Sequence, residues 1–188
     1  ILLPRTDGKI MKHLPSATEL SEAGLRFKVP EGESCLLKLK FLGRVLEIPQ
    51  LVVDDWTETL FRNMVALEQC LYPSETYITD YVLFLDFLVK SNRDVDILVQ
   101  ARVFVNCLGD TDSVATMFNG LLKDIMVCNT CSHHFVVHEK LNAFYNNPRR
   151  KLEATVRCWQ TAASSVAIII LILTFVQTVC SILQVIHP

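Results

Sequence analysis

The stretch Val166-Ala167-Ile168-Ile169-Ile170-Leu171-Ile172-Leu173-Thr174-Phe175-Val176 decides the fold that this sequence predicts. It lies in a segment without any Asp, Glu, Lys or Arg, which runs from Cys158 to the last residue, Pro188. A helix needs about 20 mostly apolar residues to cross a hydrocarbon core about 30 Å thick. We therefore expect a transmembrane helix over residues 161–186, and a buried core helix is the alternative. Its predicted core positions are Val166, Ile170, Leu173 and Val176.

A basic group precedes this segment and predicts its orientation. Arg149, Arg150, Lys151 and Arg157 are opposed only by Glu153. The positive-inside rule places such residues on the cytoplasmic side, where they also attract anionic lipid headgroups. We expect a single-pass protein in a lipid bilayer with its soluble domain in the cytoplasm. A signal peptide upstream of this sequence would reverse that orientation.

Polar residues within the apolar segment indicate a second role for it. Gln177, Ser181 and Gln184 recur at helical spacing and share one face. Such a stripe can pack against another helix inside a bilayer. We therefore also expect a homo-oligomer through the tail, which makes a purely structural membrane protein one alternative function.

Composition limits the other classes of function. The 188 residues carry a formal net charge of -2, which gives no basic footprint for nucleic acid. We expect a soluble domain at 1–148, large enough for one core, and a basic connector at 149–160. The chain begins with Ile1 rather than Met, so we expect a fragment or a processed form. The seven cysteines are scattered, which favours reduced thiols in the cytosol.

Hydrophobic periodicity predicts a mainly α fold, a helical bundle with a small β-hairpin. The segment Leu37–Phe41 alternates before the turn candidate Gly43-Arg44, and Val45–Pro49 completes the hairpin. Within the helix Trp56–Leu71 we expect one buried side made of Leu60, Phe61, Met64, Leu67 and Leu71. The other expected helices are Ala17–Ala23, a central buried helix at Tyr77–Lys90, Asp94–Leu108 (with Val103–Val105 as a strand alternative), Asp112–Val127 and His133–Asn146.

Two sequence pairs match helix-capping patterns. Ser16 and Glu19 form a capping box, and Gly24 is a natural helix stop. Asp55 and Glu58 form the second pair, with Asp55 as the expected N-cap. The paired acids Asp54-Asp55, Asp94-Asp96 and Asp110-Asp112 also stand where helices begin, so we interpret them as caps rather than as acid–base or cation sites.

Cys128, Cys131 and His138 form the group that most resembles a chemical site. Two cysteines separated by two residues, with histidine nearby, are typical of zinc ligands. On one continuous helix, however, residues 128 and 138 would lie about 15 Å apart. We therefore predict no metal and no cofactor, and a metal- or thiol-dependent enzyme using these three residues stays as an alternative. The sequence contains no phosphate loop, GxSxG or HExxH motif, so we predict a protein that is not an enzyme.

Polar residues in the helix Trp56–Leu71 leave two interpretations open. Phe61-Arg62-Asn63 and Glu68-Gln69-Cys70 add polar groups to a helix that must also bury an apolar face. Buried polar groups need hydrogen-bond partners, which favours an internal network over recognition of a partner protein.

Several segments together resemble the plant-specific family catalogued as domain of unknown function 247. The match includes Leu14-Pro15-Ser16-Ala17-Thr18-Glu19-Leu20, Val45-Leu46-Glu47-Ile48-Pro49-Gln50-Leu51, Phe61–Cys70, Asp94-Val95-Asp96-Ile97-Leu98 and Leu173–Thr178. Two departures stand out: the N-terminal half of the family is absent, and the aromatic approach to the membrane is shortened around Val156-Arg157-Cys158-Trp159.

This resemblance implies an uncharacterised membrane protein, with the plasma membrane as the expected location. Some grass relatives are linked to pollen self-incompatibility, which implies recognition of an unidentified protein partner, or signalling. The family has no agreed catalytic residues, so the resemblance assigns none to this chain.

Overall fold

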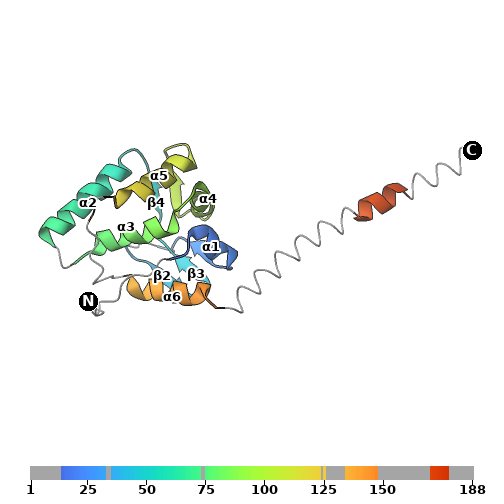
Figure 1. Ribbon diagram of the computed structural model, residues 1–188, viewed down its shortest axis with the longest axis horizontal. Coiled ribbons are helices and arrows are strands. Elements are labelled where there is room, and N and C mark those ends of the chain that lie inside the picture. Colours follow the sequence, from blue (N-terminus) through green and yellow to red (C-terminus); the bar gives the residue numbers. More distant parts are fainter. Residues whose placement is uncertain are drawn as a thin grey trace, which may run out of the picture. The chain divides into compact units, whose positions relative to one another are not determined.

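The computed structural model describes residues 14–32, 35–72, 75–123, 125, 134–147 and 170–177. The chain divides into two units, Ile1–Asn147 and Pro148–Pro188. Within the first unit, helices and short strands follow one another in the order α1 (Ala17–Glu22), β1 (Arg26–Lys28), β2 (Lys40–Leu42), β3 (Val45–Glu47), β4 (Leu51–Val53), α2 (Thr57–Leu71), α3 (Tyr77–Leu88), α4 (Asn92–Gln100), β5 (Phe104–Asn106), α5 (Thr111–Leu121) and α6 (Phe135–Tyr145) (Figure 1).

The predicted capping box begins helix α1. The Ser16 amide donates to Glu19 Oε2 at 2.8 Å, and the Glu19 amide donates to Ser16 Oγ at 3.4 Å. Gly24 follows the helix with a φ of +89°, a left-handed conformation that strains residues with a Cβ atom. The predicted start and stop of this helix are both confirmed.

Two small sheets lie beside the helices. The predicted hairpin is present, because β2 and β3 are antiparallel and pair Phe41 with Leu46. Strand β1 pairs in parallel with β3. Strand β4 pairs in parallel with β5, although α2, α3 and α4 separate the two strands in the sequence. The expected helix Asp94–Leu108 is therefore wrong in its second half, where the strand alternative is correct. The break comes after Ala101, where Arg102 adopts a φ of 59° and the Leu51 amide donates to the Val103 carbonyl at 2.8 Å.

Helix α3 is the central helix of the core, as expected. Seven of its residues are buried, including Tyr81, Phe84 and Leu88. Its neighbours are α2 and α5, and rings of α3 contact the start of α6, where Tyr81 and Phe84 each lie 6.3 Å from the His134 ring between centroids. In Figure 1, α3 lies between α2 and α5 on one side and α6 on the other.

The buried side of helix α2 differs from the prediction. Its buried residues are Thr57, Phe61, Val65 and Glu68. Of the predicted stripe only Phe61 is buried, whereas Leu60, Leu67 and Leu71 are 56%, 58% and 60% exposed. The difference arises because α3 and α5 pack against the neighbouring side of the helix, turned by about one residue from the leucines.

The predicted N-cap of α2 is also wrong. Trp56, not Asp55, occupies that position. The carboxylate of Asp54 accepts from the Trp56 amide at 3.1 Å and from the Thr57 hydroxyl at 2.8 Å. A turn built on Asp54 therefore starts the helix one residue later than expected.

The predicted fold class needs two corrections. No helix among the described residues is long and apolar enough to cross a membrane, so the prediction of a transmembrane helix is wrong. Of the expected span 161–186 the structure describes residues 170–177, which are helical. In addition, two sheets with parallel pairings replace the single hairpin of the predicted helical bundle.

Some of the residues predicted at the membrane fall within this described helical stretch. Ile170, Leu173 and Val176 lie on it and are exposed. The other predicted membrane residues lie outside the described residues: Val166, Arg149, Arg150, Lys151, Arg157, Ser181 and Gln184.

Candidate functional site

The residues suggested as metal ligands do not form a described site. His138 is buried in α6, with its ring 5.9 Å from that of Phe87 between centroids and its Nδ1 3.3 Å from Asn142 Nδ2. Cys128 and Cys131 lie outside the described residues. Among the residues that the structure describes, no group of three His, Cys, Asp or Glu side chains could hold a metal ion.

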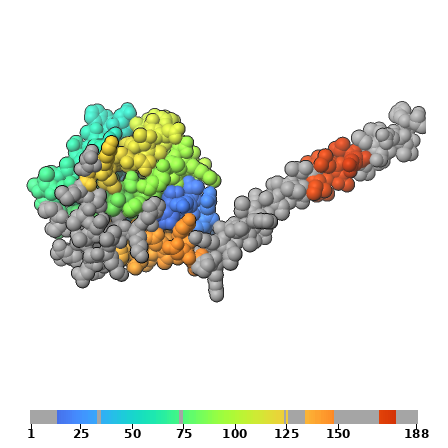
Figure 2. Space-filling model, in the orientation of Figure 1, coloured from blue at the N-terminus to red at the C-terminus, as the bar shows by residue number. Residues whose placement is uncertain are grey.

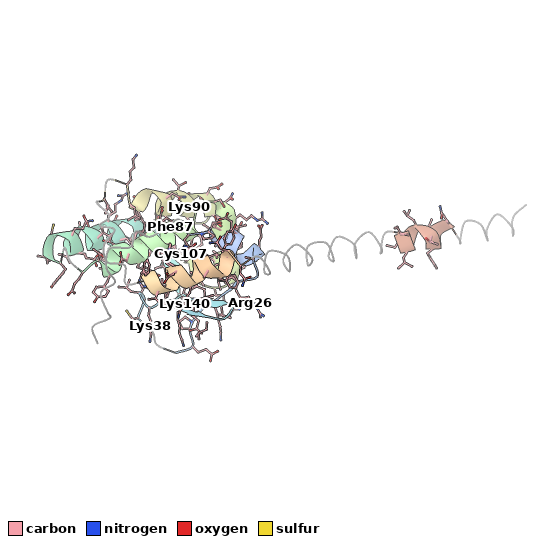
Figure 3. The ribbon with its side chains drawn as sticks, turned by 60° about the horizontal axis from the view of Figure 1, so that its bottom comes forward. Arg26, Lys38, Phe87, Lys90, Cys107 and Lys140 are labelled. Carbon is pink, nitrogen blue, oxygen red and sulfur yellow. The ribbon has the colours of Figure 1, made fainter. Side chains whose placement is uncertain are left out.

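The Phe87 ring has Lys90 as a second neighbour. The Lys90 Nζ atom lies 5.5 Å from the centre of the Phe87 ring and 2.9 Å from Asp86 Oδ2. Phe87 lies in the last turn of α3, and Lys90 is the second residue after that helix (Figure 3). His138 and Phe87 thus belong to the packing of α6 on α3, whereas the Lys90 ammonium contacts residues of α3.

The buried carboxylate of Asp94 joins two helices that are far apart in sequence. It is 1% exposed, and its Oδ1 accepts from the Thr18 amide in the first turn of α1 at 2.7 Å. Its Oδ2 accepts from the amide and the hydroxyl of Ser91, both at 2.9 Å, and from the Lys90 amide at 3.1 Å. A single carboxylate therefore stabilises the amino-terminal ends of both α1 and α4.

The charge of Asp94 is favoured despite its burial. Burial by itself would raise the pKa of this carboxyl, but the hydrogen bonds from Thr18, Ser16 and Ser91 outweigh it and hold the pKa below its ordinary value. Hydrogen bonds from Ser113 likewise lower the pKa of Asp110, whose carboxylate caps α5 as predicted. Both acids act on helix ends rather than on a cavity.

Glu68 is a second buried carboxylate with a structural role. It is 5% exposed, and its Oε1 accepts from the Ile78 amide at 2.7 Å. Its Oε2 accepts from the amide and hydroxyl of Thr79 at 2.8 and 2.7 Å. Because Ile78 and Thr79 lie in the first turn of α3, Glu68 caps a helix other than its own. The internal network predicted for the polar residues of α2 is confirmed at this position.

Arg62 completes that network at the other edge of α2. Its Nε donates to Glu58 Oε1 at 2.9 Å, and its Nη2 donates to the Gly120 carbonyl in α5, also at 2.9 Å. The charged side chains of α2 are thus directed along the edge that meets α5, and away from the exposed leucines.

One exposed side of α2 carries no charge, whereas Glu58 and Arg62, whose side chains are 47% and 39% exposed, pair with each other on another side. We define the α2 face as the residues of this fully described helix that are exposed: Thr59, Leu60, Asn63, Ala66, Leu67, Cys70 and Leu71. In the space-filling view α2, coloured teal, lies at the margin of the domain (Figure 2). A surface helix normally presents charged residues to water, so this face is unusual for a solvated one.

A groove of about 360 Å³ continues the α2 face at its C-terminal end. It is lined by Leu37, Met64, Leu67, Glu68, Tyr72, Glu75, Tyr77 and Ile78. Tyr72 is 59% exposed, and Glu68 is engaged by the first turn of α3. Apart from the exposed Glu75, the lining available to another molecule is therefore apolar and aromatic, which suits a protein side chain better than a polar ligand.

The spacing of the leucines on α2 predicts a buried stripe, whereas the structure exposes these leucines. Leu60, Leu67 and Leu71 follow helical spacing, and that spacing alone cannot tell a buried stripe from an exposed one. The uncharged residues Thr59, Asn63, Ala66 and Cys70 on the adjoining side do not distinguish the two, because they are exposed in the structure and would face water with the leucines buried as well.

Comparison with known proteins assigns the chain to a family. A family described as "Plant protein of unknown function", domain of unknown function 247, matches residues 3–180. UPF0481 protein At3g47200 of Arabidopsis thaliana is 26% identical over 190 aligned positions, which cover 97% of this chain and 40% of the relative. Putative UPF0481 protein At3g02645, also of Arabidopsis thaliana, is 27% identical over 171 positions, covering 87% of this chain and 32% of the relative.

These relatives are much longer than the chain, which spans two fifths and one third of their lengths. No solved structure matches it. Because the family match covers nearly the whole sequence, the chain belongs to the domain of unknown function 247 family of plant proteins.

Proposed function

We propose that this chain is a protein-recognition module without catalytic activity, and that the α2 face is its binding surface. The observation that carries the proposal is that the seven residues of the α2 face, on a helix described throughout, are all uncharged, although three of them are leucines more than half exposed. The charged residues Glu58 and Arg62, whose side chains are 47% and 39% exposed, pair with each other on another side of the helix. Interfaces between proteins are depleted of charge at their centres and enriched in large apolar and aromatic side chains.

The polar residues of the family signature support this assignment. Ser16, Glu19, Glu68 and Asp94 each stabilise the end of a helix through hydrogen bonds. The stability of the fold therefore explains these polar residues. It does not explain the exposed leucines of the α2 face. The resemblance to grass proteins linked to self-incompatibility agrees with a role in recognition.

A site-specific photo-cross-linker tests the proposal. Leu67 is replaced by p-benzoylphenylalanine in the full chain, and Val136, 53% exposed on α6, receives the same label as the matched control. Irradiation with plant cell extract should give a defined product from position 67 that position 136 does not give. The captured protein is then identified and its binding is measured with purified components.

The binding measurement decides the outcome. Leu60→Asp, on the α2 face, should weaken binding of the identified protein at least tenfold, whereas Val136→Asp should leave it unchanged. Circular dichroism of both variants controls for folding. Equal products from positions 67 and 136, or equal affinities for the two Asp variants, would exclude the α2 face as the binding surface.

A further inference from the structure

We propose that the partner bound by the α2 face is a second copy of this chain, with the two α2 helices packed antiparallel. This inference rests on the proposed function, because it names the occupant of the same surface. Three observations carry it: the spacing of the apolar residues, the charge of the face, and the position of the groove relative to the protruding side chains.

The apolar residues of α2 have the spacing of a helix–helix seam. Leu60, Met64, Leu67 and Leu71 are separated by four, three and four residues. This is the alternation with which two helices interdigitate side chains along a shared line. These four positions lie within 12 residues and extend about 16 Å along the helix, which is long enough for three turns of contact. The occupant is therefore a helix rather than an extended segment.

The charge of the face favours a copy of itself over a charged partner. Beside the seam lie Thr59, Asn63, Ala66 and Cys70, which are exposed and neutral. A partner bearing basic or acidic groups would bury them here without a counter-charge, which is strongly unfavourable. A second α2 face brings no charge to the centre of the contact.

The protruding side chains and the groove lie at opposite ends of α2. Trp56, which is 75% exposed, and Leu60 stand at the N-terminal end of α2. The groove lies at the C-terminal end, between Leu67, Tyr72 and Tyr77. In a two-fold interface each contact forms twice: if residue i of the first copy contacts residue j of the second, then residue j of the first copy contacts residue i of the second. An antiparallel pair places Leu60 opposite Leu71 and brings Trp56 toward the groove, twice per dimer.

The size of the surface is compatible with a specific dimer. Trp56, Leu60, Leu67, Leu71 and Tyr72 are each 56–75% exposed. With about 150–250 Å² for a whole aromatic side chain, this set exposes on the order of 600 Å². A standard interface buries about 800 Å² on each partner, so the apolar set supplies most of that area and neighbouring polar residues complete it.

Charge substitution on the full-length chain tests both the occupant and its direction. Three double variants are compared with the wild type by sedimentation equilibrium in a mild non-ionic detergent: Leu60→Lys/Leu71→Lys, Leu60→Glu/Leu71→Glu and Leu60→Lys/Leu71→Glu. The wild type should dimerise. The Lys/Lys variant alone and the Glu/Glu variant alone should each have a dimer dissociation constant at least tenfold higher than that of the wild type. Their equimolar mixture should form dimers again. Val136→Lys is the matched control and should leave dimerisation unchanged.

The Lys/Glu variant identifies the direction of packing. In an antiparallel pair the lysine introduced at position 60 of one copy meets the glutamate introduced at position 71 of the other, so this variant should dimerise by itself. In a parallel pair like charges would meet, and the variant should stay monomeric. Each of four results would overturn the inference. They are a monomeric wild type, equal dimerisation by all variants, a Lys/Lys and Glu/Glu mixture that forms no dimers, and a monomeric Lys/Glu variant. If the wild type is monomeric while position 67 still cross-links a different protein, this inference fails and the proposed function stands.

Discussion

Replacement of Asp94 by alanine is expected to lower the free energy of unfolding by about 3 kcal/mol. Asp94 is 1% exposed and accepts hydrogen bonds from three amides and one hydroxyl. Loss of the capping interaction at α4 accounts for about 1 kcal/mol. The Thr18 amide in α1 loses its acceptor as well, and an unsatisfied buried donor costs about 1–3 kcal/mol. These two terms together set the expected decrease.

Urea unfolding at pH 7, followed by far-ultraviolet circular dichroism, measures this decrease. Asp96→Ala is the matched control, because Asp96 lies on the same helix but is exposed. The control should change the free energy of unfolding by no more than about 0.5 kcal/mol. If Asp94→Ala lowers stability no more than Asp96→Ala does, the two-helix role of the Asp94 carboxylate is refuted.

The pH dependence gives an independent check on the same carboxylate. Burial opposes ionisation, but hydrogen bonds from Thr18, Ser16 and Ser91 hold the folded pKa of Asp94 below its ordinary value. The unfolded chain therefore binds this proton more tightly, so the stabilisation is complete above an unfolded pKa of about 3.9 and is lost as pH falls through the folded pKa. The stability difference between wild type and Asp94→Asn should narrow below about pH 4. A difference that stays constant down to about pH 3 would contradict this assignment.

Two further comparisons use the same unfolding assay. Glu68→Ala should lower the free energy of unfolding by about 2–3 kcal/mol, because the first turn of α3 loses its hydrogen-bond acceptor. Glu75→Ala, at an exposed neighbouring position, is the control and should change it by less than about 0.5 kcal/mol. Similar values for the two variants would reject the role of Glu68 as a cap. Gly24→Ala should destabilise by about 1 kcal/mol because its φ is +89°. Gly120→Ala should stabilise by about 0.5–1 kcal/mol, since it lies within α5 and its added Cβ would meet Arg62 Nη2 only at 3.9 Å; a gain at Gly24 or a loss at Gly120 would contradict this reasoning.

Local features of the fold could be predicted because they depend on residues close in sequence. Ser16 and Glu19 are three residues apart, so their capping box forms within one helical turn. The hairpin of β2 and β3 likewise depends on Gly43, whose φ of +61° suits the turn between them. The buried helix α3 was recognisable because nearly all of its side chains are apolar.

The candidate site could be predicted only in part. Glu68 was expected in an internal network, but nothing in the sequence indicates that its partners would be the amides of Ile78 and Thr79. The leucines of α2 were predicted to be buried because their spacing suits a core. Two adjacent apolar stripes exist on this helix, and the stripe containing Phe61 and Val65 is the one that α3 covers.

The apolar stretch 166–176 shows the limit of composition as a guide. Its lack of charge predicts a transmembrane helix, and residues 170–177 are the part of that expected helix that the structure describes. No helix in the described ranges is long enough to span a bilayer. Hydrophobicity sets which solvent a segment prefers, but it does not by itself establish a membrane-spanning helix.

The sequence by itself determined the family, the caps of α1 and α5, the hairpin and the central helix, since each depends on neighbours along the chain or on composition. Tertiary structure alone decided the pairing of β4 with β5, the double cap by Asp94 and the exposure of the α2 face. Asp94 and Thr18 are 76 residues apart, and the two β strands are separated by three helices. Such contacts form because the helices pack around one core, and local propensity contains no information about which surfaces that packing will cover or leave open.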